Sequence, residues 1–121
     1  MKAFVTGGTG FIGRSLVRQL VERGYEVRAL ARSQSAAERV QTLGAIAVPG
    51  DVTDRESMRA AMRGCDVVFH LAAIYDFAPE ALAQCAAINV DGTRNVLGLA
   101  HELRVPKIVY TSSLAVFGDT G

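Results

Sequence analysis

The sequence predicts an α/β fold with a doubly wound parallel sheet of five strands in the order 3-2-1-4-5. Two observations lead to this prediction: short apolar runs alternate with helical patterns along the chain, and a glycine-rich turn joins the first run to the first helical pattern. Strands that alternate with helices form a parallel sheet covered on both faces, and right-handed crossovers favour this strand order. With 121 residues, half of them hydrophobic, the chain is long enough for one globular domain with its own core.

Each expected strand is short and nearly continuous in apolar residues, as is typical of strands buried on both faces. In chain order, the expected strands are Lys2–Thr6, Glu26–Leu30, Ala45–Val48, Asp66–His70 and Lys107–Thr111. The helical patterns between them are Phe11–Arg23, Ser35–Leu43, Asp54–Arg63 and Pro79–Arg104. Gly24, Gly44 and Gly64 follow the first three helices, where glycine commonly ends a helix. Thr53 is expected to cap the third helix.

The turn after the first strand reads VTGGTGFIG, with a glycine at every third position from Gly7 to Gly13. Gly7 or Gly8 is expected to adopt a positive φ, and Gly10 to let the backbone approach a phosphate. Gly13 would allow the following helix to pack closely on the first strand, and the start of that helix offers free N–H groups to an anion. Because the turn joins a strand to a helix within a βαβ unit, it predicts a dinucleotide site. The alternative is a structural turn without a ligand.

A basic residue follows the second strand, at a position where an acidic residue would indicate NAD. Arg32 stands between Ala31 and Ser33, and no acidic residue follows Leu30 until Glu38. A carboxylate there would bind the ribose 2′-hydroxyl of NAD, whereas an arginine can bind the 2′-phosphate of NADP. We therefore expect NADP, with NAD as the second choice. Arg14 is a candidate second cation, and the alternative for both arginines is a solvent-exposed surface charge.

The third and fourth strands end in further candidate binding residues. Asp51 and Val52 follow the third strand, on the turn that should face the adenine, where the carboxylate can accept a hydrogen bond from the exocyclic amine. The alternative is that Asp51 only serves its own turn. The fourth strand runs into the small residues of Leu71-Ala72-Ala73, which would let the backbone pass beside a ribose. His70 is expected to be a hydrogen-bonded core histidine rather than a catalytic base.

The last helix and the fifth strand carry the polar residues that could meet a substrate. By helical spacing, Asn89 falls on a buried stripe with Leu82, Cys85, Ala86, Thr93, Val96, Leu97, Ala100 and Leu103. A buried amide needs partners, so Asn89 marks either a structural hydrogen bond or an active site. The fifth strand leads into Thr111-Ser112-Ser113, whose hydroxyls would lie where a substrate meets the nicotinamide. The alternative is that these hydroxyls cap the local backbone.

Charge and composition argue against several other classes of function. A formal net charge of +1 gives no general attraction to nucleic acid or to an anionic membrane. No apolar run approaches the ~20 residues that a membrane span needs, so no membrane partner is expected. Cys65 and Cys85 form no C-x-x-C pair. They are expected to be reduced thiols of a cytoplasmic protein rather than metal ligands or a disulfide.

Together these motifs resemble the extended short-chain dehydrogenase/reductase family, in particular its NAD(P)-dependent epimerase/dehydratase and dihydroflavonol-reductase-like members. The resemblance runs in order through TGGTGFIG, GDVTD, HLAA, NVDGTRNV, VYTSS and VFG. It implies a Rossmann-type dinucleotide-binding domain over residues 1–121. It also implies cofactor contacts at Gly7, Gly10, Phe11, Ile12, Gly13, Arg32, Asp51, Val52, Leu71, Ala72 and Ala73. Asn89 resembles the family's active-site asparagine, and Ser113 resembles the hydroxyl that binds the reacting oxygen of the substrate.

The sequence departs from this family at the catalytic base, which is the tyrosine of a Tyr-x-x-x-Lys motif. None of the three tyrosines is followed four residues later by a lysine; those positions hold Ala29, Pro79 and Leu114. The family's sixth strand and carboxy-terminal substrate domain have no counterpart either. The chain is therefore expected to be the amino-terminal portion of such an enzyme, with an incomplete domain.

The resemblance implies an enzyme that acts on a sugar nucleotide or on a ketone or alcohol, as an epimerase, a dehydratase or a reductase. We expect this chain alone to bind the dinucleotide and to catalyse little or nothing. The alternatives are a non-catalytic module that senses NADP(H) and a scaffold piece. Without a sixth strand, the fifth strand would be an open sheet edge, which predicts self-association.

Overall fold

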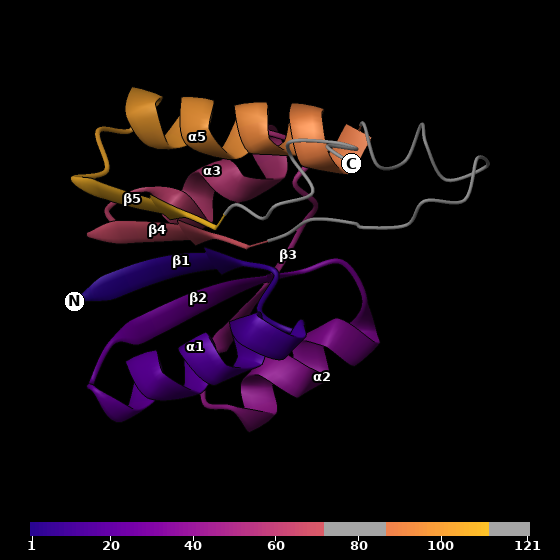
Figure 1. The fold of residues 1–121 in the computed structure, drawn as a ribbon, viewed down its shortest axis with the longest axis vertical. Helices are drawn as coiled ribbons and strands as arrows, with labels where there is room; N and C mark the ends of the chain where they lie inside the picture. The colour runs from indigo at the N-terminus through magenta and orange to yellow at the C-terminus, as the bar shows by residue number, and fades with distance from the viewer. Residues whose placement is uncertain (72–86, 112–121) are drawn as a thin grey trace, which may run out of the picture.

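The computed structural model of the protein describes residues 1–71 and 87–111, and shows a parallel sheet between two layers of helices (Figure 1). The first half contains β1 (Lys2–Thr6), α1 (Phe11–Glu22), β2 (Glu26–Ala31), α2 (Gln34–Thr42) and β3 (Ile46–Pro49). The second half contains α3 (Glu56–Met62), β4 (Val67–His70), the π-helical turn η2 (Ala87–Gly92), α5 (Thr93–Glu102) and β5 (Lys107–Tyr110). None of the helices in these described ranges is long and apolar enough to cross a membrane.

The sheet has five strands in the order β3-β2-β1-β4-β5, which confirms the predicted topology. All four strand pairs are parallel, and β1 lies between β2 and β4. Thr6 of β1 is level with His70 of β4, which is level with Tyr110 of β5. Because all strands end at the same edge of the sheet, the segments that follow them converge there, and this edge is where ligands bind in open α/β sheets.

The alternation of side chains along β1 divides the interior into two cores. Ala3 and Val5 face α1 and α2, whereas Phe4 faces α3 and α5; all three are fully buried. The first core includes Val17 and Leu20 of α1, Val27 and Ala29 of β2, and Val40 of α2. The second includes Met58 and Met62 of α3, Val68 of β4, and Val96, Leu99 and Ala100 of α5. Burying each larger apolar side chain contributes about 1.5–3 kcal/mol, so both layers are held to the sheet.

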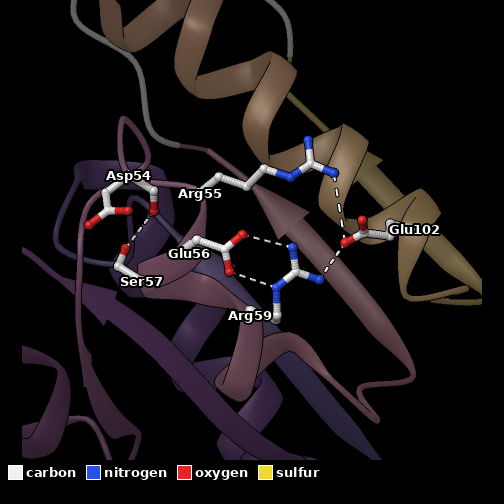
Figure 2. A network of polar contacts seen from close by, with 6 residues as sticks. All are labelled: Asp54, Arg55, Glu56, Ser57, Arg59 and Glu102. Carbon is white, nitrogen blue, oxygen red and sulfur yellow. Dashed lines mark hydrogen bonds and ion pairs between the residues drawn. The ribbon is translucent and has the colours of Figure 1, made fainter.

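Ion pairs join α3 to α5 on the molecular surface (Figure 2). The carboxylate of Glu102 in α5 pairs with the guanidinium of Arg59 and lies 3.8 Å from that of Arg55. Arg59 also pairs with Glu56 of its own helix at 2.7 Å, which holds the pKa of the Glu56 carboxyl below its ordinary value. Exposed pairs of this kind contribute little to stability, so the apolar contacts dominate the docking of the two helices.

The start of α3 differs from the sequence-based expectation, which made Thr53 its cap. The helix begins at Glu56 with Arg55 in the cap position, and no side chain caps it. Instead, the N–H of Thr53 donates to Oδ1 of Asp51 at 3.0 Å, and the N–H of Asp54 donates to the carbonyl of Asp51. Thr53 as a cap is therefore wrong, because an Asx turn holds these residues outside the helix.

The last helix also differs from its predicted form, since it contains a π-helical turn before α5. Ile88 is buried there, whereas Asn89 is only half-buried, and Leu99 rather than Leu97 is buried in α5. The wider spacing of a π turn displaces the apolar stripe from the positions that a regular 3.6-residue period gives. Full burial of Asn89 was therefore a wrong prediction. Pro79, Leu82, Cys85 and Ala86 lie outside the described residues.

Candidate functional site

A cavity of about 590 Å³ lies at the carboxyl ends of the strands. Segments from both halves of the sheet form it, as the topology predicts. The described residues that line it are Gly7, Thr9, Gly10, Leu30, Arg32, Ser33, Ser35, Ala36, Arg39, Asp51, Val52, Leu71 and Ile88. Most of the predicted cofactor contacts that the structure describes are therefore brought together at one site.

The glycine-rich turn forms the wall of this cavity after β1. Gly7 has a φ of +73°, so it, and not Gly8, takes the left-handed conformation that the turn requires. The N–H of Gly10 then donates to the carbonyl of Gly7 at 3.2 Å. A Cβ on Gly13 would lie 1.8 Å from the Gly7 oxygen, so this glycine permits close packing of α1 on the turn, rather than on the strand as expected.

Gly10 differs from these two glycines because the protein itself leaves room for a side chain there. A Cβ on Gly10 would meet only the Gly7 carbonyl oxygen among the described residues, at an ordinary 3.4 Å. The residue is exposed and lines the cavity. Because glycine has no side chain, a space at the start of α1 stays open, and a bound group could fill it.

The first turn of α1 is suited to an anion. Gly10 provides no side-chain cap, and the turn contains no acidic residue, so the positive end of the helix dipole is not neutralised locally. The side chains of Phe11 and Ile12 are 83% and 62% exposed, and they line a separate hollow on α1. Only their backbone N–H groups remain candidates for binding a phosphate.

Arg32 lines the cavity after β2, and a second cation, Arg39, joins it from α2. Arg14, the second cation expected from the sequence, instead stacks over the Phe11 ring at 5.8 Å and lines the separate hollow on α1. Arg39 was not predicted from the sequence. It lies one helical turn after Ser35, which also lines the cavity, but the sequence does not show which face of this helix points towards the cavity.

Asp51 stabilises its own turn and also lines the cavity, so the adenine contact stays a prediction. Its Oδ1 accepts hydrogen bonds from the N–H and the hydroxyl of Thr53, each at 3.0 Å, so the carboxylate stabilises its own turn. Asp51 and Val52 also line the cavity. Two further side chains hold this turn: Ser57 Oγ accepts from the N–H of Asp51 at 3.1 Å, and Asn95 Nδ2 donates to the carbonyl of Val52 at 2.9 Å.

His70 is a hydrogen-bonded core histidine, as predicted. It is fully buried, with Nδ1 2.7 Å from Thr6 Oγ1 and Nε2 2.9 Å from Thr93 Oγ1. Its ring also stacks on Tyr110, with centroids 5.6 Å apart. Burial lowers the pKa of His70 to about 4, so the imidazole is neutral at neutral pH. Leu71, the next residue, lines the cavity and donates its N–H to Thr6 Oγ1.

The predicted catalytic residues are less completely placed. Asn89 lies in η2, one residue after Ile88, which lines the cavity. Ser113, Ala72 and Ala73 lie outside the described residues. In the part of the chain that the structure describes, no group of three acidic, histidine or cysteine side chains could hold a metal ion.

Comparison with known proteins places this geometry in context. Residues 4–121 match the 3-beta hydroxysteroid dehydrogenase/isomerase family. A 4-hydroxy-2-methyl-3-oxo-4-farnesyl-3,4-dihydroquinoline-1-oxide ketoreductase from Stigmatella aurantiaca is 45% identical over 98% of this chain and 35% of its own. A putative dihydroflavonol 4-reductase from Synechocystis is 44% identical over 98% of this chain and 34% of its own. The chain thus spans about a third of the length of these relatives.

The fold also matches solved structures. A short-chain dehydrogenase/reductase superfamily protein from Agrobacterium tumefaciens, with bound NAD, superposes with a TM-score of 0.83. It is 31% identical, over 98% of this chain and 34% of that protein. The match therefore covers nearly all of this chain.

Proposed function

Because the chain belongs to the 3-beta hydroxysteroid dehydrogenase/isomerase family, within the extended short-chain dehydrogenases/reductases, we propose that it binds NADP(H). It would form the cofactor-binding part of an oxidoreductase that acts on a ketone or a secondary alcohol. The observation that carries this proposal is the cavity at the strand ends, which the glycine turn, Asp51 and two arginines line. Two relatives that are named as reductases support the reaction class.

The cavity offers complementary groups for each part of the dinucleotide. The first turn of α1 would hold the pyrophosphate at the space left by Gly10. Asp51 and Val52 would contact the adenine, and Arg32 with Arg39 would bind the 2′-phosphate. The bound dinucleotide would supply the hydride that the reaction transfers.

The preference for NADP depends on two cations that line the cavity. Arg32 and Arg39 line it, and Asp51 is the single carboxylate among the described lining residues. A 2′-phosphate needs this positive charge, whereas a free 2′-hydroxyl does not. We expect NADPH to bind more tightly than NADH, and each of Arg32→Ala and Arg39→Ala to weaken NADPH about 10-fold or more with little effect on NADH.

Isothermal titration calorimetry with NADPH and NADH tests this expectation on four proteins: the unmodified chain, Arg32→Ala, Arg39→Ala and Arg14→Ala. Arg14→Ala is the matched control, because Arg14 lies on α1 outside the cavity, and should change neither affinity. NADH binding as tightly as NADPH to the unmodified chain would refute the preference for NADP. Binding of neither cofactor would refute the proposed function itself.

We also propose that the isolated chain binds the cofactor without turning it over. The sequence contains no Tyr-x-x-x-Lys motif. Both ring nitrogens of His70 lie within hydrogen-bond distance of the hydroxyls of Thr6 and Thr93, and burial lowers the pKa of His70 to about 4, which makes it a weak base. Asn89 and Ser113 are the candidates that would assist a base from elsewhere. Steady oxidation of NADPH by the purified chain, with a ketone substrate, would contradict this proposal.

Self-association through β5 is a further part of the proposal. This strand is at one end of the sheet, with Ile108 39% and Tyr110 47% exposed. The other edge strand, β3, ends in Pro49, which has no N–H to donate to a pairing strand. We therefore propose that a second copy of the chain pairs with β5 rather than with β3.

A further inference from the structure

The turn that would face the adenine is held by a residue outside the cavity. We propose that Asn95 is a positioning residue for adenine recognition, which fixes the Asp51–Val52 turn through the carbonyl of Val52. This inference rests on the proposed function, because it assumes that a dinucleotide places its adenine against this turn. It assigns to α5 a part in cofactor selection that the lining of the cavity does not reveal.

The contact between Asn95 and the turn is direct. Asn95 Nδ2 donates to the Val52 carbonyl oxygen at 2.9 Å, across 43 positions in the sequence. The Val52 side chain is 3% exposed, packs in the core beneath α3 and α5, and lines the cavity. The hydrogen bond and the apolar packing therefore fix two sides of the same residue, and together set how the turn faces the cavity.

The other hydrogen bonds that the described residues make with this turn come from nearby segments. Thr53 and Ser57 contact Asp51 from within six residues, and the N–H of Gly50 donates to the Ala31 carbonyl of the adjacent strand at 3.2 Å. Asn95 adds a connection to α5, the helix that continues from η2. Since η2 supplies Ile88 to the lining of the same cavity, Asn95 links the turn to the helical segment that carries Ile88.

A purely structural role would make the same contact, so the test must report on the base itself. Hypoxanthine has a carbonyl where adenine has its exocyclic amine, and it cannot donate from that position to the Asp51 carboxylate. We expect the unmodified chain to prefer NADPH over nicotinamide hypoxanthine dinucleotide phosphate about 10-fold. Asp51→Ala should lose this preference completely, and serves as the reference for complete loss.

Asn95→Asp keeps the shape of the side chain and removes the donor. If Asn95 positions the turn, the preference for adenine should fall to about 3-fold or less in this variant, measured by calorimetric titration with both dinucleotides. Asn95→Ala should give the same result, and provides a second measurement if the aspartate variant does not fold. Glu102→Gln is the matched control, because it weakens the ion pairs of α5 with α3 (Figure 2) and leaves the turn untouched.

The outcomes separate this inference from the proposed function. A preference that falls in both Asn95 variants and persists in Glu102→Gln supports the positioning role. A preference for adenine that persists in the Asn95 variants overturns the inference and leaves NADP binding intact. An equal fall of this preference in Glu102→Gln overturns the inference too, because loosening of α5 alone would then explain the fall. If the unmodified chain does not bind NADPH, both proposals are overturned. If it binds both dinucleotides equally well, the inference is overturned, because the turn then does not recognise the adenine amine.

Discussion

Single glycines in the turn after β1 have separate physical roles. Gly7 provides the left-handed φ of +73°, and Gly13 provides the close approach of α1 to the Gly7 carbonyl. Gly10 serves neither purpose among the described residues, because a Cβ there meets only an ordinary contact. Substitution of Gly13 can therefore test what the fold requires, and substitution of Gly10 can test what a ligand requires.

Substitution of Gly13 by alanine should destabilise the protein, whereas the same change at Gly10 should mainly affect binding. The Gly13→Ala Cβ would overlap the Gly7 oxygen, and such overpacking costs about 1–3 kcal/mol. Gly10→Ala should keep its free energy of unfolding and bind NADPH several-fold more weakly. Urea denaturation and calorimetric titration measure the two effects. A Gly10→Ala variant with unchanged affinity would show that no ligand fills this space.

The buried histidine makes stability depend on pH. The pKa of His70 is about 4 in the folded chain and ordinarily 6.5, so the unfolded chain takes up the proton first as the pH falls. Stability should therefore be complete above pH 6.5 and decrease towards pH 4, by about 3 kcal/mol in total. Denaturation curves between pH 4 and pH 7.5 measure the slope.

His70→Gln should flatten this pH dependence, because its side chain does not titrate. Titration of the His70 imidazole by NMR gives an independent measurement, in which it should remain neutral at pH 5.5. An ordinary pKa for His70 would contradict the burial argument.

Several site residues could be predicted from the sequence because local patterns identify them. The glycine turn, Arg32 and the Asp51–Val52 turn each follow a strand, so topology alone brings them to one edge of the sheet. Arg39 and Asn95 could not be predicted in this way. Their roles depend on which face of a helix points towards the cavity or the turn, and this depends on packing between segments far apart in the sequence.

At the scale of whole elements, strands were predicted more accurately than helix starts. Three strands begin at the predicted residue, and the other two, β3 and β4, begin one residue later, because buried parallel strands leave continuous apolar runs. The start of α3 was missed because the Thr53 hydroxyl bonds to Oδ1 of Asp51 and does not cap the helix. The π turn before α5 was missed because periodicity assumes one helical repeat throughout.

The start of α2 offers a test of a helix end that the structure defines fully. Ser33 Oγ accepts from the N–H of Ala36 at 3.1 Å and caps the helix. Ser33→Ala should lower the free energy of unfolding by about 1 kcal/mol. Ser35→Ala, two positions later in the same turn, should change it by less than about 0.5 kcal/mol. Equal effects of the two substitutions, measured by urea denaturation, would argue against the cap.

At the scale of the whole molecule, the two edges of the sheet differ. Both edge strands expose apolar side chains, Ile46 on β3 and Ile108 and Tyr110 on β5, but β3 ends in a proline and β5 does not. Under the proposal of self-association, we expect copies to pair at the β5 edge. This asymmetry follows from the sequence once the strand order is known, and the sequence predicted that order correctly.

Sedimentation velocity over a range of concentrations should show reversible association of the chain. Ile108→Lys should shift the equilibrium towards monomer, because an edge lysine opposes strand pairing. Ile46→Lys places the same charge at an exposed position on the β3 edge, and should leave association unchanged. A single monomeric species at the highest concentration would contradict the proposal.

The division of the interior by β1 has a consequence for how this gene can vary. Phe4 belongs to one core, and its neighbours Ala3 and Val5 belong to the other, so successive side chains of the central strand alternate between the two cores. Loss of one residue within the strand would turn the side chains on one side of the deletion to the opposite core. In-frame deletions of a single residue should therefore be far rarer here than conservative replacements, which makes the length of β1 more constrained than its composition.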